Sequence, residues 1–217
     1  MSVAENIKKI KSEIPTHVKL VAVTKTYPLE KILEAYNVGH KIFGENKVQE
    51  LTPKHQDLPK DIEWHLIGHL QTNKVKYIAP FVSMIHSVDS LKLLQEIDKC
   101  AEKSRRMIDC LLQIHIAQEE TKFGLSFEEA EAIIVSKELL QMKNIRVVGL
   151  MGMATLTEDE IQIRKEFKSL KTFFDKLKTN HSGRTTLSMG MSSDYKIAIE
   201  EGSNLIRVGS LIFGNRK

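Results

Sequence analysis

The stretch VKLVAVTKTYPLEKILEAYNVGHKIFGEN, residues 18–46, decides the fold class. It begins with an apolar run at 18–25, continues with apolar residues at helical spacing over 29–39, and ends with a second apolar run at 41–46. Short apolar runs are typical of buried strands, and apolar residues spaced i, i+3, i+4 among charged ones are typical of helices. The stretch therefore predicts a strand–helix–strand unit whose two strands lie parallel.

The same alternation continues along the rest of the chain. Six further apolar runs are expected to form strands, at residues 63–69, 84–90, 109–117, 145–154, 185–192 and 204–214. Helical spacing recurs between them, for example over residues 89–103, 127–141 and 160–178. Eight strands alternating with helices predict a single-domain (β/α)8 barrel of the TIM type over residues 1–217. A doubly wound open sheet is the structural alternative.

Composition narrows the class of protein. The 217 residues include 32 basic and 28 acidic ones, spread along the chain, and 41% are hydrophobic. Without a basic tail or interleaved aromatic residues, the sequence argues against nucleic acid as a partner. No apolar run approaches the roughly 18 residues of a membrane helix.

The cysteines and the N-terminal residues indicate the cellular compartment of the protein. Cys100 and Cys110 fit no CxxC pattern, and the first residues, MSVAENIKKIKSEI, are charged and amphipathic, without the apolar segment of a signal peptide. We therefore expect a cytoplasmic protein whose cysteines stay reduced.

Polar residues collect where the expected strands end, which is where a β/α barrel carries its functional groups. Lys25, Asn46, His69, Ser87, Asp89 and Ser192 close five of the strands, and Arg207 and Gly209 lie within the eighth. All of these residues are expected to converge on one mouth of the barrel.

Two of these positions indicate specific chemistry. A partly desolvated amine on Lys25 would be a Schiff-base nucleophile, although a lysine before a helix is more often simply exposed. Ser192 and Gly209 suggest a phosphate-binding cup, because a hydroxyl and a closely approaching backbone both suit an anion. The alternative for the segment after Ser192 is ordinary helix capping by Ser193 and Asp194.

Other motifs are excluded or ambiguous. Four residues along one strand would place His65 and His69 about 13 Å apart, too far to share a zinc ion. The sequence contains no GxGxxG, Walker A or GxSxG motif. Glu45, Glu50 and Asp89 are candidate general bases, although isolated carboxylates at the ends of elements more often cap or pair.

Several long motifs resemble the YggS/PROSC family of pyridoxal phosphate homeostasis proteins, whose fold is the alanine-racemase-like barrel of fold type III enzymes that use pyridoxal phosphate (PLP). They cover nearly the whole chain: VAVTKTYP (21–28), FGENKVQE (43–50), WHLIGHLQTNK (64–74), HSVDS (86–90), EETKFG (119–124), GLMGMA (149–154) and LSMGMSSDYKIAIEEGSNLIRVGSLIFG (187–214).

The resemblance implies a cofactor and a set of residues that bind it. Pyridoxal 5′-phosphate would form a Schiff base with Lys25, with Asn46 beside it. Ser192 and the backbone around Gly209 and Ser210 would hold the phosphate, and Arg207 would approach the pyridine nitrogen. An arginine cannot accept a proton, so in that place it disfavours a protonated ring and weakens the cofactor as an electron sink.

The resemblance also implies a function. It implies a PLP carrier or buffer in intracellular PLP homeostasis, without a dedicated reaction, that supplies PLP-dependent apoenzymes. The chain ends just after the eighth expected strand, so we expect it to lack the additional domain of the racemases and to be a monomer. The alternatives are a slow amino-acid racemase or lyase, with His69, Asp89 or Tyr27 as base, and a module that binds partner proteins through its surface.

Overall fold

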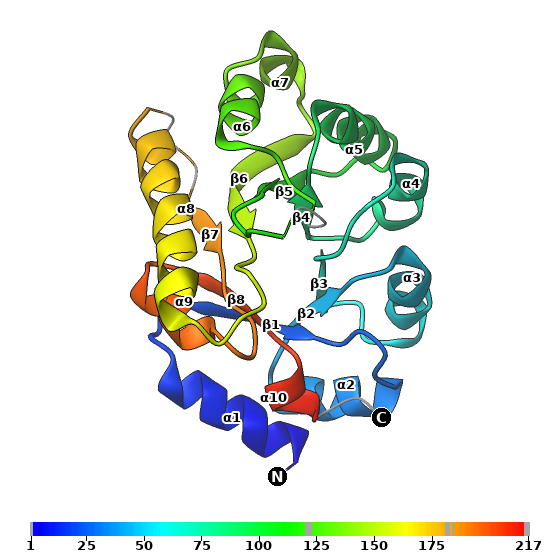
Figure 1. The fold of residues 1–217 in the computed structure, drawn as a ribbon. Coiled ribbons are helices and arrows are strands. Elements are labelled where there is room, and N and C mark those ends of the chain that lie inside the picture. Colours follow the sequence, from blue (N-terminus) through cyan, green and yellow to red (C-terminus); the bar gives the residue numbers. More distant parts are fainter. Residues whose placement is uncertain (1, 120–122, 181–182, 184, 215–217) are drawn as a thin grey trace.

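The apolar runs form a closed parallel barrel in the computed structural model of the chain, which describes residues 2–119, 123–180, 183 and 185–214 (Figure 1). Strand order follows chain order from β1 to β8, and β8 pairs with β1 to complete the ring. This closure confirms the barrel and excludes the open doubly wound sheet.

The strands are short and mostly buried on both faces, which explains why the sequence shows apolar runs rather than alternation. They are β1 (Lys19–Val23), β2 (Ile42–Glu45), β3 (Glu63–Leu66), β4 (Met84–Val88), β5 (Ile108–Ile114), β6 (Ile145–Gly152), β7 (Thr186–Ser188) and β8 (Leu205–Val208).

Helices surround the barrel (Figure 1). They are α1 (Val3–Glu13), α2 (Leu29–Asn37), α3 (Val48–Asp57), the 3-10 turn η1 (Thr72–Lys74), α4 (Val75–Ile78), α5 (Leu91–Lys103), α6 (Phe127–Ile134), α7 (Lys137–Gln141), α8 (Glu160–Asn180), α9 (Tyr195–Glu200) and α10 (Ser210–Phe213). Among the described residues, no helix is long and apolar enough to cross a membrane.

The N-terminal charged stretch becomes helix α1, which packs against α2 and α10. Ser2 begins it with a capping box, in which its hydroxyl accepts from the amide of Glu5 and the Glu5 carboxylate accepts from the amide of Ser2. The side chain of Asn6 donates to the carbonyl of Ile212 at 2.9 Å and so fixes α1 to α10. Both ends of the described chain therefore meet on one side of the barrel (Figure 1).

The strands end a few residues earlier than the apolar runs predicted, and two segments form other elements than expected. The run at 204–214 is not one strand, because β8 ends at Val208 and α10 begins at Ser210. A short apolar run fits a buried helix as well as a strand, so periodicity could not separate them. The helix expected over 127–141 is two helices, because Ser136 starts a new one by accepting from the amide of Leu139 at 3.2 Å.

The barrel interior is only partly apolar. Val21, Leu111, Met151 and Leu205 fill part of it, whereas the large aromatic side chains of Phe43, Trp64 and Phe167 pack in the layer between strands and helices. The rest of the interior holds the buried polar side chains of His65, His86, Ser188 and Arg207. This departs from the layers of branched apolar residues that usually fill such barrels.

We expect Gly149→Ala to disrupt the sheet locally. Gly149 pairs with Thr186 between β6 and β7, and a Cβ atom at Gly149 would lie 1.7 Å from the Thr186 carbonyl oxygen. The strands would have to separate, with an expected loss of about 1–3 kcal/mol in the free energy of unfolding. Urea denaturation measures this, and Gly39→Ala, where the new atom meets nothing within 4 Å but φ is +81°, gives the cost of backbone strain alone.

Candidate functional site

A cavity of about 640 Å³ opens at the carboxyl ends of the strands. All six residues that the sequence analysis assigned to the site line it: Lys25, Asn46, Ser192, Arg207, Gly209 and Ser210. They lie in β8 or in the segments that follow β1, β2, β7 and β8, so barrel closure brings together residues up to 185 positions apart in the chain. The structure therefore unites the predicted set in one place.

Lys25 lies in a turn rather than at the end of a strand. β1 ends at Val23, and Lys25 and Thr26 form the turn that leads toward α2. Lys25 is half-buried, and Thr26 has φ of +68°, in the left-handed region that non-glycine residues rarely adopt. This conformation of the neighbouring residue fixes the direction in which the chain leaves the cavity.

The part of the wall next to the Lys25 turn is formed where β7 and β8 end. The amide of Gly209 donates to the hydroxyl of Ser192 at 3.2 Å, which joins the two segments. A Cβ at Gly209 would lie 3.3 Å from both the carbonyl oxygen and Cβ of Val23, so glycine allows β8 to end close against β1. The carboxylate of Asp194 accepts from the amide of Met191 at 2.6 Å and closes the turn before α9 instead of capping that helix.

Arg207 is buried beneath the cavity, with 3% of its surface exposed. It donates to the hydroxyl oxygen of Ser188 at 2.5 Å and to the carbonyl oxygen of Gly152 at 3.1 Å. Burial lowers the pKa of Arg207 to about 10, against the opposing attraction of Asp194. The guanidinium therefore stays charged at neutral pH in a poorly hydrated place, which favours a negatively charged or electron-rich ligand.

A chain of hydrogen bonds continues from Arg207 down the barrel axis. Nδ1 of His86 lies 3.2 Å from the hydroxyl of Ser188, and Nε2 of His86 lies 3.0 Å from Nδ1 of His65. Burial lowers the pKa of both histidines, to about 3 for His65, so both are neutral. Because arginine only donates, the Ser188 hydroxyl oxygen accepts from Arg207, and the direction of the two bonds beyond it is set by the tautomers of His86 and His65.

His65 and His69 lie in different environments, and the premise that one strand carries both is wrong. β3 ends at Leu66, and His69 lies at the mouth of the cavity. Nδ1 of His69 is 3.1 Å from the carboxylate of Asp89, and its ring stacks on Phe123 with centroids 4.3 Å apart. His69 is the only histidine among the described residues that line the cavity.

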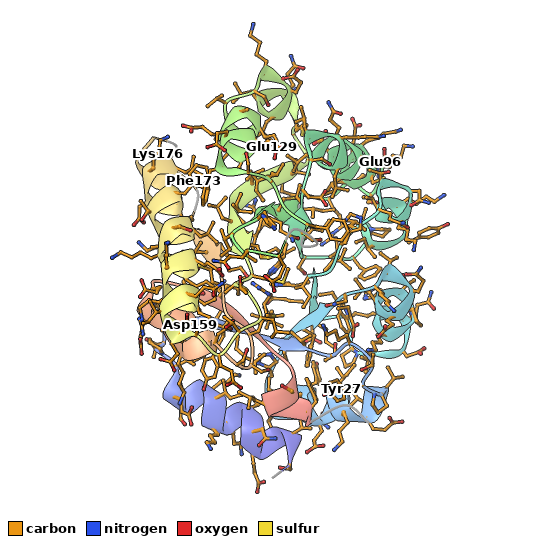
Figure 2. All side chains as sticks on the ribbon, in the orientation of Figure 1. Tyr27, Glu96, Glu129, Asp159, Phe173 and Lys176 are labelled. Atoms are coloured by element: carbon orange, nitrogen blue, oxygen red, sulfur yellow. The ribbon has the colours of Figure 1, made fainter. Side chains whose placement is uncertain are left out.

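The other candidate side chains serve structural contacts. Ser87 is buried and donates to the carbonyl of Gly68 at 2.6 Å. The Tyr27 hydroxyl donates to the carbonyl of Gly214 and the ring packs on Phe213, so Tyr27 lies beside α2 and α10 rather than in the cavity (Figure 2). Glu45 and Glu50, considered as bases, are paired with Lys54.

Sequence reasoning missed the rest of the wall. Its apolar part includes Val23, Met153, Met191 and Leu211, and Gln113 adds an amide. The methionines lie within the GLMGMA and LSMGMSS motifs, so their positions at strand ends were the available signal. Of the motif at 119–124, residues 120–122 lie outside the part of the chain that the structure describes.

Comparison with known proteins agrees with this geometry. The family described as "alanine racemase, N-terminal domain" matches residues 1–217, so the chain is an alanine-racemase-type barrel protein. A pyridoxal phosphate homeostasis protein from Aquifex aeolicus is 42% identical over 201 residues, covering 92% of this chain and 87% of the relative. The chain belongs to the YggS/PROSC family of pyridoxal phosphate homeostasis proteins.

Solved structures agree at two levels of similarity. The structure of PipY from Synechococcus elongatus with PLP bound has a TM-score of 0.89 and 36% identity, covering 98% of this chain and all of that one. Alanine racemase from Clostridium difficile has a TM-score of 0.82 at 16% identity, with 99% of this chain matched to 60% of the racemase. The second likeness concerns the fold alone.

Proposed function

We propose that the chain binds pyridoxal 5′-phosphate as a Schiff base on Lys25 and acts as a PLP carrier or buffer without a dedicated reaction. The observation that carries the proposal is one cavity lined by a lysine, a buried arginine and a serine–glycine wall suited to phosphate. The names of the relatives and the PLP-bound PipY structure support it.

The residues present fit this cofactor. When bound, PLP supplies an aldehyde that condenses with an amine, a flat ring and a phosphate dianion. Lys25 offers the amine, and the apolar surfaces of Met153 and Met191 suit a ring. The hydroxyl of Ser192, whose oxygen accepts from the Gly209 amide and whose proton can be donated, and the backbone at Gly209 and Ser210 suit the phosphate.

Arg207 and Asn46 complete the proposed set. Asn46 lies beside the expected position of the cofactor, and Arg207 would face the pyridine nitrogen. Since a guanidinium cannot take a proton from the ring, it keeps that nitrogen unprotonated. An unprotonated ring is a weak electron sink, which suits storage of the cofactor better than transformation of amino acids.

In this role the protein acts inside the cell as a monomer and delivers PLP to PLP-dependent apoenzymes. A carrier must release what it binds, and the cavity opens to solvent at a rim that includes exposed Ser210 and Leu211.

The test is reduction of the PLP-loaded protein with borohydride, followed by peptide mass analysis. We expect a pyridoxyl adduct on the peptide containing Lys25, a visible absorption band in the parent, and neither in Lys25→Ala. Lys47→Ala is the matched control. Lys47 is an exposed lysine that follows Asn46 in the chain but does not line the cavity. An adduct that persists on another lysine in Lys25→Ala would contradict the assignment.

A slow racemase or lyase is the second candidate, favoured by the contact between His69 and Asp89 at the mouth. An imidazole oriented by a carboxylate can act as a general base. Incubation of the loaded protein with L-alanine in deuterium oxide tests this reading. Deuterium at Cα that is lost in His69→Gln would favour the enzyme, whereas no exchange above free PLP would favour the carrier.

A further inference from the structure

Helix α3 contacts the turn that carries Lys25 through two hydrogen bonds. The amide of Thr26 donates to the carboxylate of Glu50 at 2.8 Å, and the ammonium of Lys54 donates to the carbonyl oxygen of Thr24 at 2.8 Å. Glu50 and Lys54 lie one helical turn apart, so they share a face of α3. Both residues that flank Lys25 are therefore fixed by the same helix.

The same cluster fixes the end of β2. The ammonium of Lys54 lies 2.6 Å from the carboxylate of Glu45, which also accepts from the hydroxyl of Thr24 at 2.6 Å. Glu45 is the last residue of β2 and directly precedes Asn46, which lines the cavity. One ammonium thus joins the segments that present Lys25 and Asn46.

Stability alone is a poor explanation for this cluster. Glu45 has no exposed surface and Lys54 has 8%, so both charges are largely removed from water. Apolar residues of similar volume often stabilise a fold as well as a buried ion pair does. The strained φ of Thr26 would also relax unless its surroundings held it. The cluster holds a strained turn at the one position where the proposed function needs a defined lysine.

We propose that Glu50 and Lys54, oriented by Glu45, are positioning residues that preset the Lys25 turn for uptake of PLP. The inference rests on the proposed function. Because the turn is ordered before the cofactor arrives, less conformational entropy is lost on binding, and both the affinity and the association rate rise.

Three variants of Glu50 separate hydrogen bonding from charge. Glu50→Ala removes the acceptor for Thr26, Glu50→Asp keeps the charge but shortens its reach, and Glu50→Gln keeps an acceptor oxygen but removes the charge. We expect the Kd for PLP to rise at least tenfold in Glu50→Ala and about as much in Glu50→Asp. Glu50→Gln should remain within threefold of the parent. The association rate, followed by visible absorption, should fall in the same order.

Glu34→Ala is the matched control. The Glu34 carboxylate on α2 accepts from the amide of Val3 at 2.8 Å, and its side chain is 32% exposed, against 28% for Glu50. It lies outside the cavity wall, so we expect its Kd for PLP to stay within twofold of the parent. Thermal unfolding of each cofactor-free variant shows how much stability each substitution removes.

The outcomes separate the two proposals. Parental affinity in both Glu50→Ala and Glu50→Asp, whatever their melting temperatures, would overturn the positioning role. Equal loss of affinity in Glu34→Ala would overturn it too, because a general loss of stability would then be the cause. If the parent protein gives no Lys25 adduct, the proposed function is wrong, and the positioning role, which rests on it, is wrong with it.

Discussion

Lowering the pH from 7 to 5 is expected to destabilise the folded protein by about 4 kcal/mol through two buried histidines alone. Burial lowers the pKa of His40 to about 4 and that of His65 to about 3. In the unfolded chain both would titrate near 6.5. Below pH 6.5 the two histidines become protonated in the unfolded chain but stay neutral in the folded protein. By pH 5 each histidine therefore lowers the free energy of unfolding by about 2 kcal/mol.

The loss has a defined pH window and a defined direction. Stability is unaffected by these groups above about pH 7 and falls as the pH drops from about 6.5 toward the folded-state pKa values of about 4 and 3. His86 acts in the same direction, because burial lowers its pKa as well. Glu45 acts in the opposite direction, since burial raises its pKa against the attraction of Lys54.

A comparison of variants isolates the histidine contribution. In His40→Gln the amide can still donate to the carbonyl of Ile42, which the imidazole contacts at 2.8 Å. Urea denaturation at pH 7 and pH 5 should show about 2 kcal/mol less destabilisation in this variant than in the parent. His17→Gln, which changes an exposed histidine, should match the parent. Equal destabilisation of His40→Gln and the parent would contradict the expectation.

The sequence predicted the architecture because the pattern that encodes it is local. Each strand–helix unit shows its own change from apolar run to helical spacing, and eight such units indicate a barrel. The ends of the elements were less predictable. The apolar run around Ser210 fits a strand and a helix equally well. In the structure the backbone changes conformation at Gly209, between the end of β8 and the start of α10.

The places of Lys25 and Ser192 in the cavity wall were predictable, because each residue closes an apolar run inside a long motif and lies just beyond a strand. Contacts across the barrel were not predictable, because they join residues far apart in sequence. Ser188 and His86 are separated by 102 residues, and a shift of one residue in either strand would turn its side chain away from the axis. The pairing of Glu45 with Lys54 likewise depends on the rotation of α3, which the sequence does not specify.

Arg207→Met is expected to weaken PLP binding about 10- to 100-fold without lowering the stability of the cofactor-free protein. The guanidinium is buried, and its two hydrogen bonds to described residues go to neutral oxygens, those of Ser188 and Gly152, with Asp194 as the anion that attracts it. Burial disfavours its charge, as the lowered pKa of about 10 indicates. Removing the cation therefore relieves desolvation and offsets the two lost hydrogen bonds.

The affinity of Arg207→Met for PLP should fall, because PLP would lose a hydrogen bond from a charged donor in a poorly hydrated site. Such a bond is worth about 1.5–3 kcal/mol. Equilibrium titration with PLP and thermal unfolding without it measure the two quantities separately. Arg164→Met, which removes a surface arginine paired with Glu200 and Glu201, should leave the affinity unchanged. A fall in melting temperature with unchanged affinity in Arg207→Met would instead mean that Arg207 and the hydrogen-bonded histidines below it serve the barrel rather than the cofactor.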